Sequence, residues 1–300
     1  MPELTVERLV KRYGQTLAVD DLSFAVDSGV VTGFLGPNGS GKSTTMRALL
    51  GLVQPTSGSA LVLGKPFSEL THPVRTVGAS LDAKDVHPGR SGRSHLRTLA
   101  AAAGLPSSRV DEVLDMTELT PAQDRRVKGY SMGMRQRLAL AAALLGDPRI
   151  LMLDEPANGL DPQGMRWLRD ILRALAAEGR AVLISSHVLS EVEQTVDEVV
   201  VIGAGRLVMQ GSLADLVTRD QRPSLVRSPR ASELRELLES AGASVSNDGR
   251  PDTLLVQDAT MEQIGTLAAE HGIALFELTR SVTTLEDRFL ELTGEGGHVR

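Results

Sequence analysis

The sequence predicts an α/β protein with a mostly parallel sheet, joined to a smaller α+β domain. Strand-type segments at residues 30–35, 150–153 and 181–184 alternate with helix-type segments, which is the pattern of a parallel sheet with crossover helices. A polar stretch at residues 218–224 interrupts the apolar pattern, and shorter strand and helix segments follow it. We therefore expect a large domain over residues 1–218 and a small C-terminal α+β domain over residues 219–300.

The composition bounds the classes of protein that fit. The chain has 300 residues, 41% of them hydrophobic, which is enough for a large domain and a small one. The net charge is -6, with both signs spread along the chain, so no nucleic-acid partner is expected. The absence of cysteine excludes disulfides and thiolate metal sites. Because no apolar run approaches the ~20 residues that span a bilayer, membrane association would have to go through a partner.

The elements of the large domain follow from apolar patterning and turn residues. The predicted strands are 4–9, 22–26, 30–35, 60–63, 150–153, 181–184, 199–202 and 207–209, and the predicted helices are 44–50 and 164–177. Gly51 is a natural end for the first helix. Residues 91–145 are rich in Ala and Leu and broken at 104–106 and 120–121, which indicates a helical subdomain over about residues 84–145.

The small domain is predicted from shorter segments of the same kinds. We expect strands at 225–227, 253–257 and 274–278 and helices after Ser228, at 261–270 and from Thr283 onward. Ser228 is the expected N-cap of the first helix, with Pro229 at its first position. Thr283 and Glu286 form a capping-box pattern for the last helix.

A glycine-rich loop carries the first chemical signal. It consists of Gly36, Pro37, Asn38, Gly39, Ser40, Gly41, Lys42, Ser43 and Thr44. This matches the phosphate-binding P-loop, and it stands in the expected context, after a strand and before a helix. Glycine lets backbone N–H groups surround the phosphates, while Lys42 would bind the β- and γ-phosphates and Ser43 would bind Mg²⁺. A nucleoside triphosphate and Mg²⁺ are therefore the expected ligands, whereas a chance glycine turn is disfavoured by the context.

Two acidic residues and a histidine follow two other predicted strands. Asp154 fits the acid that holds Mg²⁺ through its water shell, and Glu155 fits the base that orients the attacking water. Neighbours on a strand point to opposite faces, but they can diverge around one ligand at its carboxyl end. His187, after strand 181–184, could reach the γ-phosphate from the same edge. A solvated acidic pair and a structural histidine are the alternatives, and the upstream P-loop favours the catalytic interpretation.

With these residues in place, the run Tyr130-Ser131-Met132-Gly133-Met134 and the later Asp161 complete a recognisable series. The chain resembles the nucleotide-binding subunit of an ABC transporter over about residues 4–217, a P-loop NTPase of ABC type with a helical subdomain. The resemblance implies that Tyr13 stacks on adenine and that Val19 packs beside the base. It assigns Ser131 and Gly133 to contacts with the γ-phosphate, Asp161 to the D-loop and His187 to the switch position.

Two departures from the family pattern affect the expected site. The family signature is Leu-Ser-Gly-Gly-Gln, so Met134 replaces an amide that could bond the ribose, while Ser131 and Gly133 remain at a helix N-terminus. The position that usually holds the glutamine of the Q-loop falls on Asp82, whose carboxylate is a hard oxygen ligand for Mg²⁺.

The resemblance also implies partners. In this family the signature of one subunit covers the ATP held by another, so a second copy would form a head-to-tail dimer. The short form with a C-terminal extension, ending in residues 285–292, resembles bacterial export ATPases of the drug- and bacitracin-resistance types. We expect a separate polytopic membrane permease, docked near residues 84–96, and a peripheral position on the cytoplasmic face of the cell membrane. The cargo would be a drug, peptide or lipid-like compound.

The main alternative is an ABC-type ATPase without a permease, acting in translation or DNA repair. Translation-type members usually carry two such domains, and this chain has one P-loop. Repair-type members insert a long coiled coil, and no sustained heptads lie between Thr44 and Tyr130. A non-hydrolysing ATP-binding regulator is a third alternative, against which Glu155 and His187 argue.

Overall fold

A computed structural model describes residues 2–81, 86–188, 193–213, 223–247 and 249–280. Within these residues the chain forms two compact units, of which the first ends at Leu213 and the second is described over residues 223–280. The boundary predicted at residue 218 lies outside the described residues and stays a prediction.

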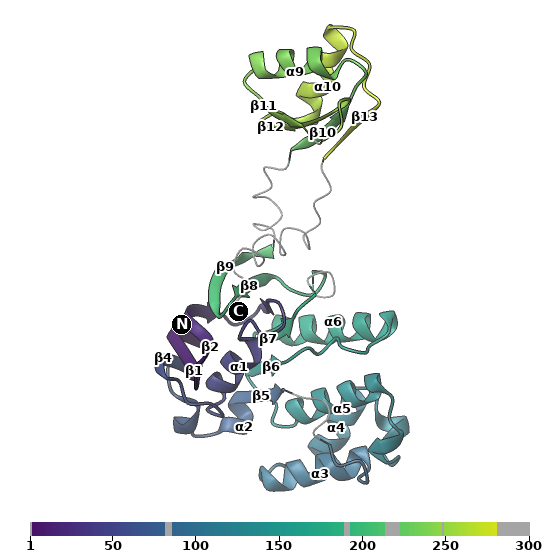
Figure 1. Ribbon diagram of the computed structural model, residues 1–300. Coiled ribbons are helices and arrows are strands. Elements are labelled where there is room, and N and C mark those ends of the chain that lie inside the picture. The colour runs from purple at the N-terminus through teal and green to yellow at the C-terminus, as the bar shows by residue number, and fades with distance from the viewer. Residues whose placement is uncertain (1, 82–85, 189–192, 214–222, 248, 281–300) are drawn as a thin grey trace. The chain divides into compact units, whose positions relative to one another are not determined.

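The first unit is built on a six-stranded sheet in the order β5-β6-β7-β3-β8-β9 (Figure 1). Its strands are β3 (Val31–Leu35), β5 (Val77–Ser80), β6 (Ile150–Leu153), β7 (Ala181–Ser186), β8 (Glu198–Gly203) and β9 (Arg206–Ser212). All neighbours are parallel except β9, which pairs antiparallel with β8. Every residue of β3, β6 and β7 is buried, as expected for central parallel strands covered on both faces. The predicted α/β fold is therefore confirmed.

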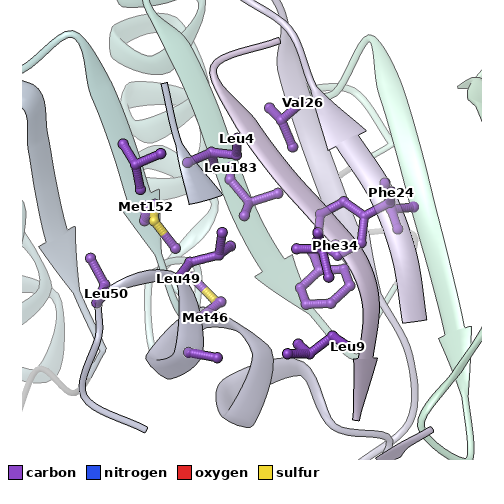
Figure 2. Close-up of a cluster of buried hydrophobic side chains, with 14 of the residues drawn as sticks. Leu4, Leu9, Phe24, Val26, Phe34, Met46, Leu49, Leu50, Met152 and Leu183 are labelled. Atoms are coloured by element: carbon purple, nitrogen blue, oxygen red, sulfur yellow. The ribbon is translucent and has the colours of Figure 1, made fainter. Parts of the chain in front are cut away.

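A three-stranded antiparallel sheet packs beside the parallel one. Its order is β2-β1-β4, with β1 spanning Leu4–Tyr13, β2 Thr16–Val26 and β4 Ser57–Val62. The strands β1 and β2 are longer than predicted because their polar ends pair with each other, down to Tyr13 opposite Thr16. Apolar side chains of this sheet, of β3 and of helix α1 (Lys42–Leu49) form one buried cluster (Figure 2). Phe24 and Phe34 meet there with ring centroids 5.1 Å apart.

The predicted helical region forms three main helices. They are α3 (Gly92–Ala102), α4 (Ser108–Met116) and α5 (Met132–Leu144), which gather beside β5 and β6 in Figure 1. The breaks fall at the predicted glycine and proline positions. Arg109 ties α4 to the end of α5, because its guanidinium donates to the carbonyls of Leu144 (2.9 Å) and Leu145 (3.2 Å). Helix α6 (Pro162–Ala177) connects β6 to β7, and the short helix α2 (Pro73–Thr76) precedes β5.

The second unit is a four-stranded antiparallel sheet with two helices (Figure 1). Its order is β11-β12-β10-β13, formed by β10 (Ser224–Arg227), β11 (Ser244–Asn247), β12 (Thr253–Gln257) and β13 (Glu277–Arg280). Helices α9 (Ala231–Ser240) and α10 (Met261–Glu270) supply Leu234 and Ile264 to a core that also contains Val226, Leu254 and Val256.

Some boundaries in this unit differ from the predicted ones. Helix α9 begins at Ala231 instead of Pro229, because Ser228 is buried and its hydroxyl donates to the Ala274 carbonyl at 2.9 Å. Strand β11 was not predicted, whereas α10 has the predicted bounds and begins with a capping box between Thr260 and Gln263. The helix predicted from Thr283 lies outside the described residues. Among the helices of the described residues, none is both long and apolar enough to cross a membrane.

Candidate functional site

Three loops that carry the predicted chemistry meet at one edge of the parallel sheet. The glycine-rich loop follows β3, Asp154 and Glu155 follow β6, and His187 follows β7, which lies between β3 and β6. The glycine-rich loop after β3 and the acid pair after β6 line a cavity of about 580 Å³, while His187 does not line it and contacts Glu155 instead. The cavity is lined by Tyr13, Ala18, Asn38, Gly39, Ser40, Gly41, Lys42, Ser43, Thr44, Leu81, Met132, Gln136, Asp154, Glu155 and Asn158. Ligands of open α/β sheets bind at this kind of position.

Glycine is required at two places in the loop. At Gly41 φ is +103°, and a Cβ there would lie 2.6 Å from the carbonyl oxygen of Ala18. At Gly36 a Cβ would lie 2.5 Å from the carbonyl oxygen of Ile202. Both obstacles are backbone atoms, so a side chain could not be accommodated without moving the loop. The glycines therefore let the loop approach the backbones of β2 and β8 closely.

Lys42 opens helix α1 and its side chain is buried beneath the loop. Its ammonium donates to the carbonyls of Gly36 and Pro37, the latter at 3.2 Å, and lies 4.0 Å from Glu155 Oε1. Burial lowers the pKa of Lys42, and the nearby carboxylates Glu155 and Asp154 partly oppose that shift. A cation held this way, next to open cavity, is arranged to receive a phosphate group.

Ser43 and Asp154 come together across the sheet edge. The Ser43 hydroxyl donates to Asp154 Oδ2 at 2.7 Å. Hydroxyl and carboxylate oxygens are ligands that Mg²⁺ prefers, usually together with substrate phosphates and water. The described residues contain no group of three or more His, Cys, Asp or Glu side chains that could hold a metal. These two oxygens therefore fit Mg²⁺ only with a phosphate-bearing ligand.

Glu155 turns out of the strand direction through an unusual backbone conformation. Its φ is +50°, a left-handed value that is uncommon for residues other than glycine. Asp154 and Glu155 consequently both face the cavity, although consecutive strand residues normally point apart. Nδ1 of His187 lies 2.9 Å from each carboxylate oxygen of Glu155. The structure thus brings together the acid pair and the histidine that the sequence singled out.

Two polar residues at this turn were missed by the sequence reasoning. The hydroxyl of Ser185 accepts from the Glu155 N–H at 2.9 Å and donates to Asp154 Oδ1. The Gln136 amide donates to the carbonyls of Glu155 (3.4 Å) and Asn158 (3.2 Å). A serine near the end of a fully buried, otherwise apolar strand was the available signal for Ser185. For Gln136 no local signal exists, because it lies within α5 and its partners are in the loop after β6.

Tyr13 and Val19 were both predicted near the base. Tyr13 lines the cavity and is 47% exposed, with Nζ of Lys11 4.8 Å above its ring. Val19 is fully buried and does not line the cavity, where its neighbour Ala18 lies instead. Asp82 lies outside the described residues, while the preceding Leu81 lines the cavity.

The signature residues are held at the start of helix α5. Ser131 is the N-cap and its hydroxyl accepts from the Met134 N–H at 3.2 Å. Ser131, Gly133 and Met134 do not line the cavity, although Met132 does. Asp161 caps helix α6 and accepts from the Gly164 N–H at 2.7 Å. Ser131 and Asp161 thus act as helix N-caps in this structure. Neither they nor Gly133 and Met134 reach the cavity that Lys42 lines.

The parallel sheet, the glycine-rich loop and the acidic strand end define a P-loop nucleoside triphosphatase. A family model described as ABC transporter matches residues 19–158. The chain is 36% identical over 295 residues to YhcH, an uncharacterized ABC transporter ATP-binding protein of Bacillus subtilis, covering 97% of this chain and 96% of that protein. It is 35% identical to the bacitracin transport ATP-binding protein BcrA of Bacillus licheniformis, covering 96% of each. The protein belongs to the ABC transporter ATP-binding proteins.

The structural comparison agrees with this assignment. A solved structure of the ATP-binding subunit of an ABC transporter superposes with a TM-score of 0.65 at 27% identity, covering 72% of this chain and 92% of that one. A second family model, described as a domain of unknown function, matches residues 224–286. The first unit of the chain is accordingly an ABC ATPase domain that binds ATP.

Proposed function

We propose that this protein is the ATP-hydrolysing subunit of an exporter, in which two copies close head to tail around ATP and power a separate membrane permease. One observation carries the ATPase part. Lys42, Ser43, Asp154 and Glu155 line one cavity, and His187 contacts Glu155 from the end of β7, the strand between β3 and β6.

The chemistry assigned to each residue follows from its position. Lys42 would neutralise the β- and γ-phosphates, and Ser43 and Asp154 would hold Mg²⁺, whose charge would offset that of the phosphates. Glu155 would orient the attacking water. His187, whose Nδ1 lies 2.9 Å from both carboxylate oxygens of Glu155, would hold that carboxylate and contact the γ-phosphate. Removing a positioned general base typically lowers turnover by about 10²–10⁴-fold.

The head-to-tail dimer is supported by the placement of the signature. Ser131 and Gly133 resemble residues that contact the γ-phosphate, yet neither lines the cavity that holds Lys42 in its own chain. Ser131 is exposed at the N-terminus of α5, where backbone N–H groups favour an anion. A second copy would place this helix end over the P-loop and complete the site.

Mixing two inactive variants tests this arrangement. Lys42→Ala disables the P-loop and Ser131→Arg disables the signature. Neither homodimer therefore contains an intact site. A head-to-tail heterodimer of the two contains one site built from an intact P-loop and an intact signature. ATPase activity should therefore appear on mixing and should exceed the sum of the separate variants.

A matched control places both substitutions in the same chain and leaves the other chain unchanged. Wild type mixed with the double variant Lys42→Ala/Ser131→Arg forms heterodimers with no intact site, so activity should fall below that of the wild-type portion alone. No activity in the first mixture, together with undiminished wild-type activity in the second, would contradict the head-to-tail arrangement, even if the ATPase assignment stands.

The permease and the export direction are proposed from similarity. BcrA, by its name, serves bacitracin transport, which supports a peptide, drug or lipid-like cargo for this protein. Export and a position at the cytoplasmic face of the membrane follow from the same resemblance. The docking surface is proposed around residues 86–96, where Arg90 is exposed next to the start of α3.

Affinity purification of the tagged protein from detergent-solubilised membranes tests this part. A polytopic membrane protein should co-purify, and exchange of residues 86–93 for a Gly/Ser segment of equal length should reduce its recovery while leaving ATP binding unchanged. Recovery of only soluble partners would favour the ATPase without a permease.

A further inference from the structure

The turn after β6 depends on a buried hydroxyl that belongs to another strand. Ser185 lies in β7 and is fully buried. Its hydroxyl accepts a hydrogen bond from the Glu155 N–H at 2.9 Å and donates one to Asp154 Oδ1. A single side chain therefore contacts the main chain of one acid and the carboxylate of the other.

These contacts fix the Asp154 carboxylate at both oxygens. Oδ2 accepts from the Ser43 hydroxyl at 2.7 Å, and Oδ1 accepts from Ser185. With both oxygens bonded, the carboxylate plane has one favoured rotation, and Oδ2 is directed at Ser43, the other proposed Mg²⁺ ligand. Loss of the Ser185 hydroxyl would leave Oδ1 free and allow the carboxylate to rotate.

The same hydroxyl supports the left-handed backbone of Glu155. A φ of +50° is unfavourable for a glutamate, so neighbouring contacts must hold it. The N–H is held by Ser185 and the carbonyl by the Gln136 amide at 3.4 Å. The direction in which the Glu155 side chain leaves the turn, toward His187, depends on that conformation.

We propose that Ser185 is a positioning residue that aligns Asp154 and Glu155 together, so that Mg²⁺ binding and water activation are set by one hydroxyl. The inference rests on the proposed ATPase role of this site. Ser185 does not line the cavity, and its hydroxyl contacts only the two acids among the described residues, so it would act through them. Removing it should therefore disturb Mg²⁺ dependence and turnover at once.

The experiment compares Ser185→Ala and Ser185→Thr with a matched control, Ser186→Ala. Ser186 lies next in the same strand and is 2% exposed, but among the described residues its hydroxyl bonds the backbone of Val188 and neither acid. Binding of a fluorescent, non-hydrolysable ATP analogue is titrated with Mg²⁺, and kcat is measured separately at saturating ATP and Mg²⁺. Thermal unfolding confirms that each variant is folded.

Ser185→Ala should raise the half-saturating Mg²⁺ concentration for analogue binding and lower kcat, each by about tenfold, the size expected when a hydrogen bond to a charged group is lost. Analogue binding without Mg²⁺ should stay at the wild-type level. Ser185→Thr keeps the hydroxyl and should lie closer to wild type than Ser185→Ala in both measurements, and Ser186→Ala should match the wild-type Mg²⁺ dependence.

Two results would overturn the proposal. One is a Ser185→Ala variant with the Mg²⁺ dependence and kcat of Ser186→Ala. The other is a threonine variant further from wild type than the alanine variant in both measurements. Either leaves the ATPase proposal intact, because that proposal would fail separately if the wild-type protein bound the analogue without any dependence on Mg²⁺.

Discussion

Replacing Gly41 with alanine should damage the first unit far more than the same change at Gly39. Both glycines have positive φ, +103° and +83°, so alanine at either position adopts a backbone conformation that is unfavourable by about 1–2 kcal/mol. At Gly39 an added Cβ meets nothing within 4 Å. At Gly41 it would lie 2.6 Å from the Ala18 carbonyl oxygen and 3.3 Å from Val19 Cγ2.

At Gly41 the close contact adds a second free-energy cost, which alanine at residue 39 would not have. Forcing an extra methyl group into a packed region typically costs about 1–3 kcal/mol, and the obstacle here is a backbone oxygen of the neighbouring strand. For a unit of this size about 1 kcal/mol lowers Tm by roughly 2–4 °C. Gly41→Ala should therefore unfold about 2–12 °C below Gly39→Ala.

Differential scanning calorimetry without nucleotide measures this difference. Nucleotide is left out because Gly39 and Gly41 both line the cavity, and unequal ATP binding would alter the two Tm values. Equal Tm values for the two variants would refute the argument that close backbone packing, and not loop conformation alone, requires glycine at residue 41.

Three further predictions concern the proposed catalytic base Glu155, the buried Lys42 and the second unit. Glu155→Gln should retain ATP binding, lose turnover and accumulate as a dimer with ATP in size-exclusion chromatography; a monomeric variant with wild-type turnover would contradict the role of Glu155. Because burial lowers the Lys42 pKa, the unfolded chain binds more protons between that lowered pKa and the ordinary lysine value, so the nucleotide-free protein should gain stability relative to Lys42→Met as pH rises through this window. Denaturant unfolding at several pH values checks this, and parallel pH profiles for the two proteins would count against it. Thr260→Ala removes the capping box of α10 and should destabilise the second unit by about 1 kcal/mol without changing ATP affinity, as calorimetry and nucleotide titration can establish.

The parts of the site that sequence reasoning located are those with local causes. The loop from Gly36 to Thr44 carries its glycines, lysine and serine at a fixed spacing, and the strand ending at Leu153 is apolar throughout, so both could be recognised from neighbouring residues. The α/β fold was predicted from the alternation of strand-type and helix-type segments along the chain. In the second unit, the capped helix α10 was placed correctly for a similarly local reason.

What sequence reasoning missed depends on contacts between distant segments. Ser185 bonds Glu155 and Asp154 from 30 and 31 residues away, so its place in an apolar strand marks it as unusual but does not indicate its partners. The left-handed conformation of Glu155 is likewise held from β7 and α5. Ser228 looked like a helix cap because its neighbours suit one, but its hydroxyl is directed to Ala274, 46 residues later.

The strand order of the parallel sheet has a consequence for how the protein is made. Ser43 and Asp154 are 111 residues apart, and β7, which separates their strands, ends at Ser186. A chain emerging from the ribosome therefore cannot join Ser43 to Asp154 through paired strands until β7 has been made, and such long-range pairing is intrinsically slow. After the sheet has formed, ATP at a concentration 100 times Kd would stabilise it by about 2.7 kcal/mol. ATP, the fuel of the finished protein, would in this way also favour its maturation.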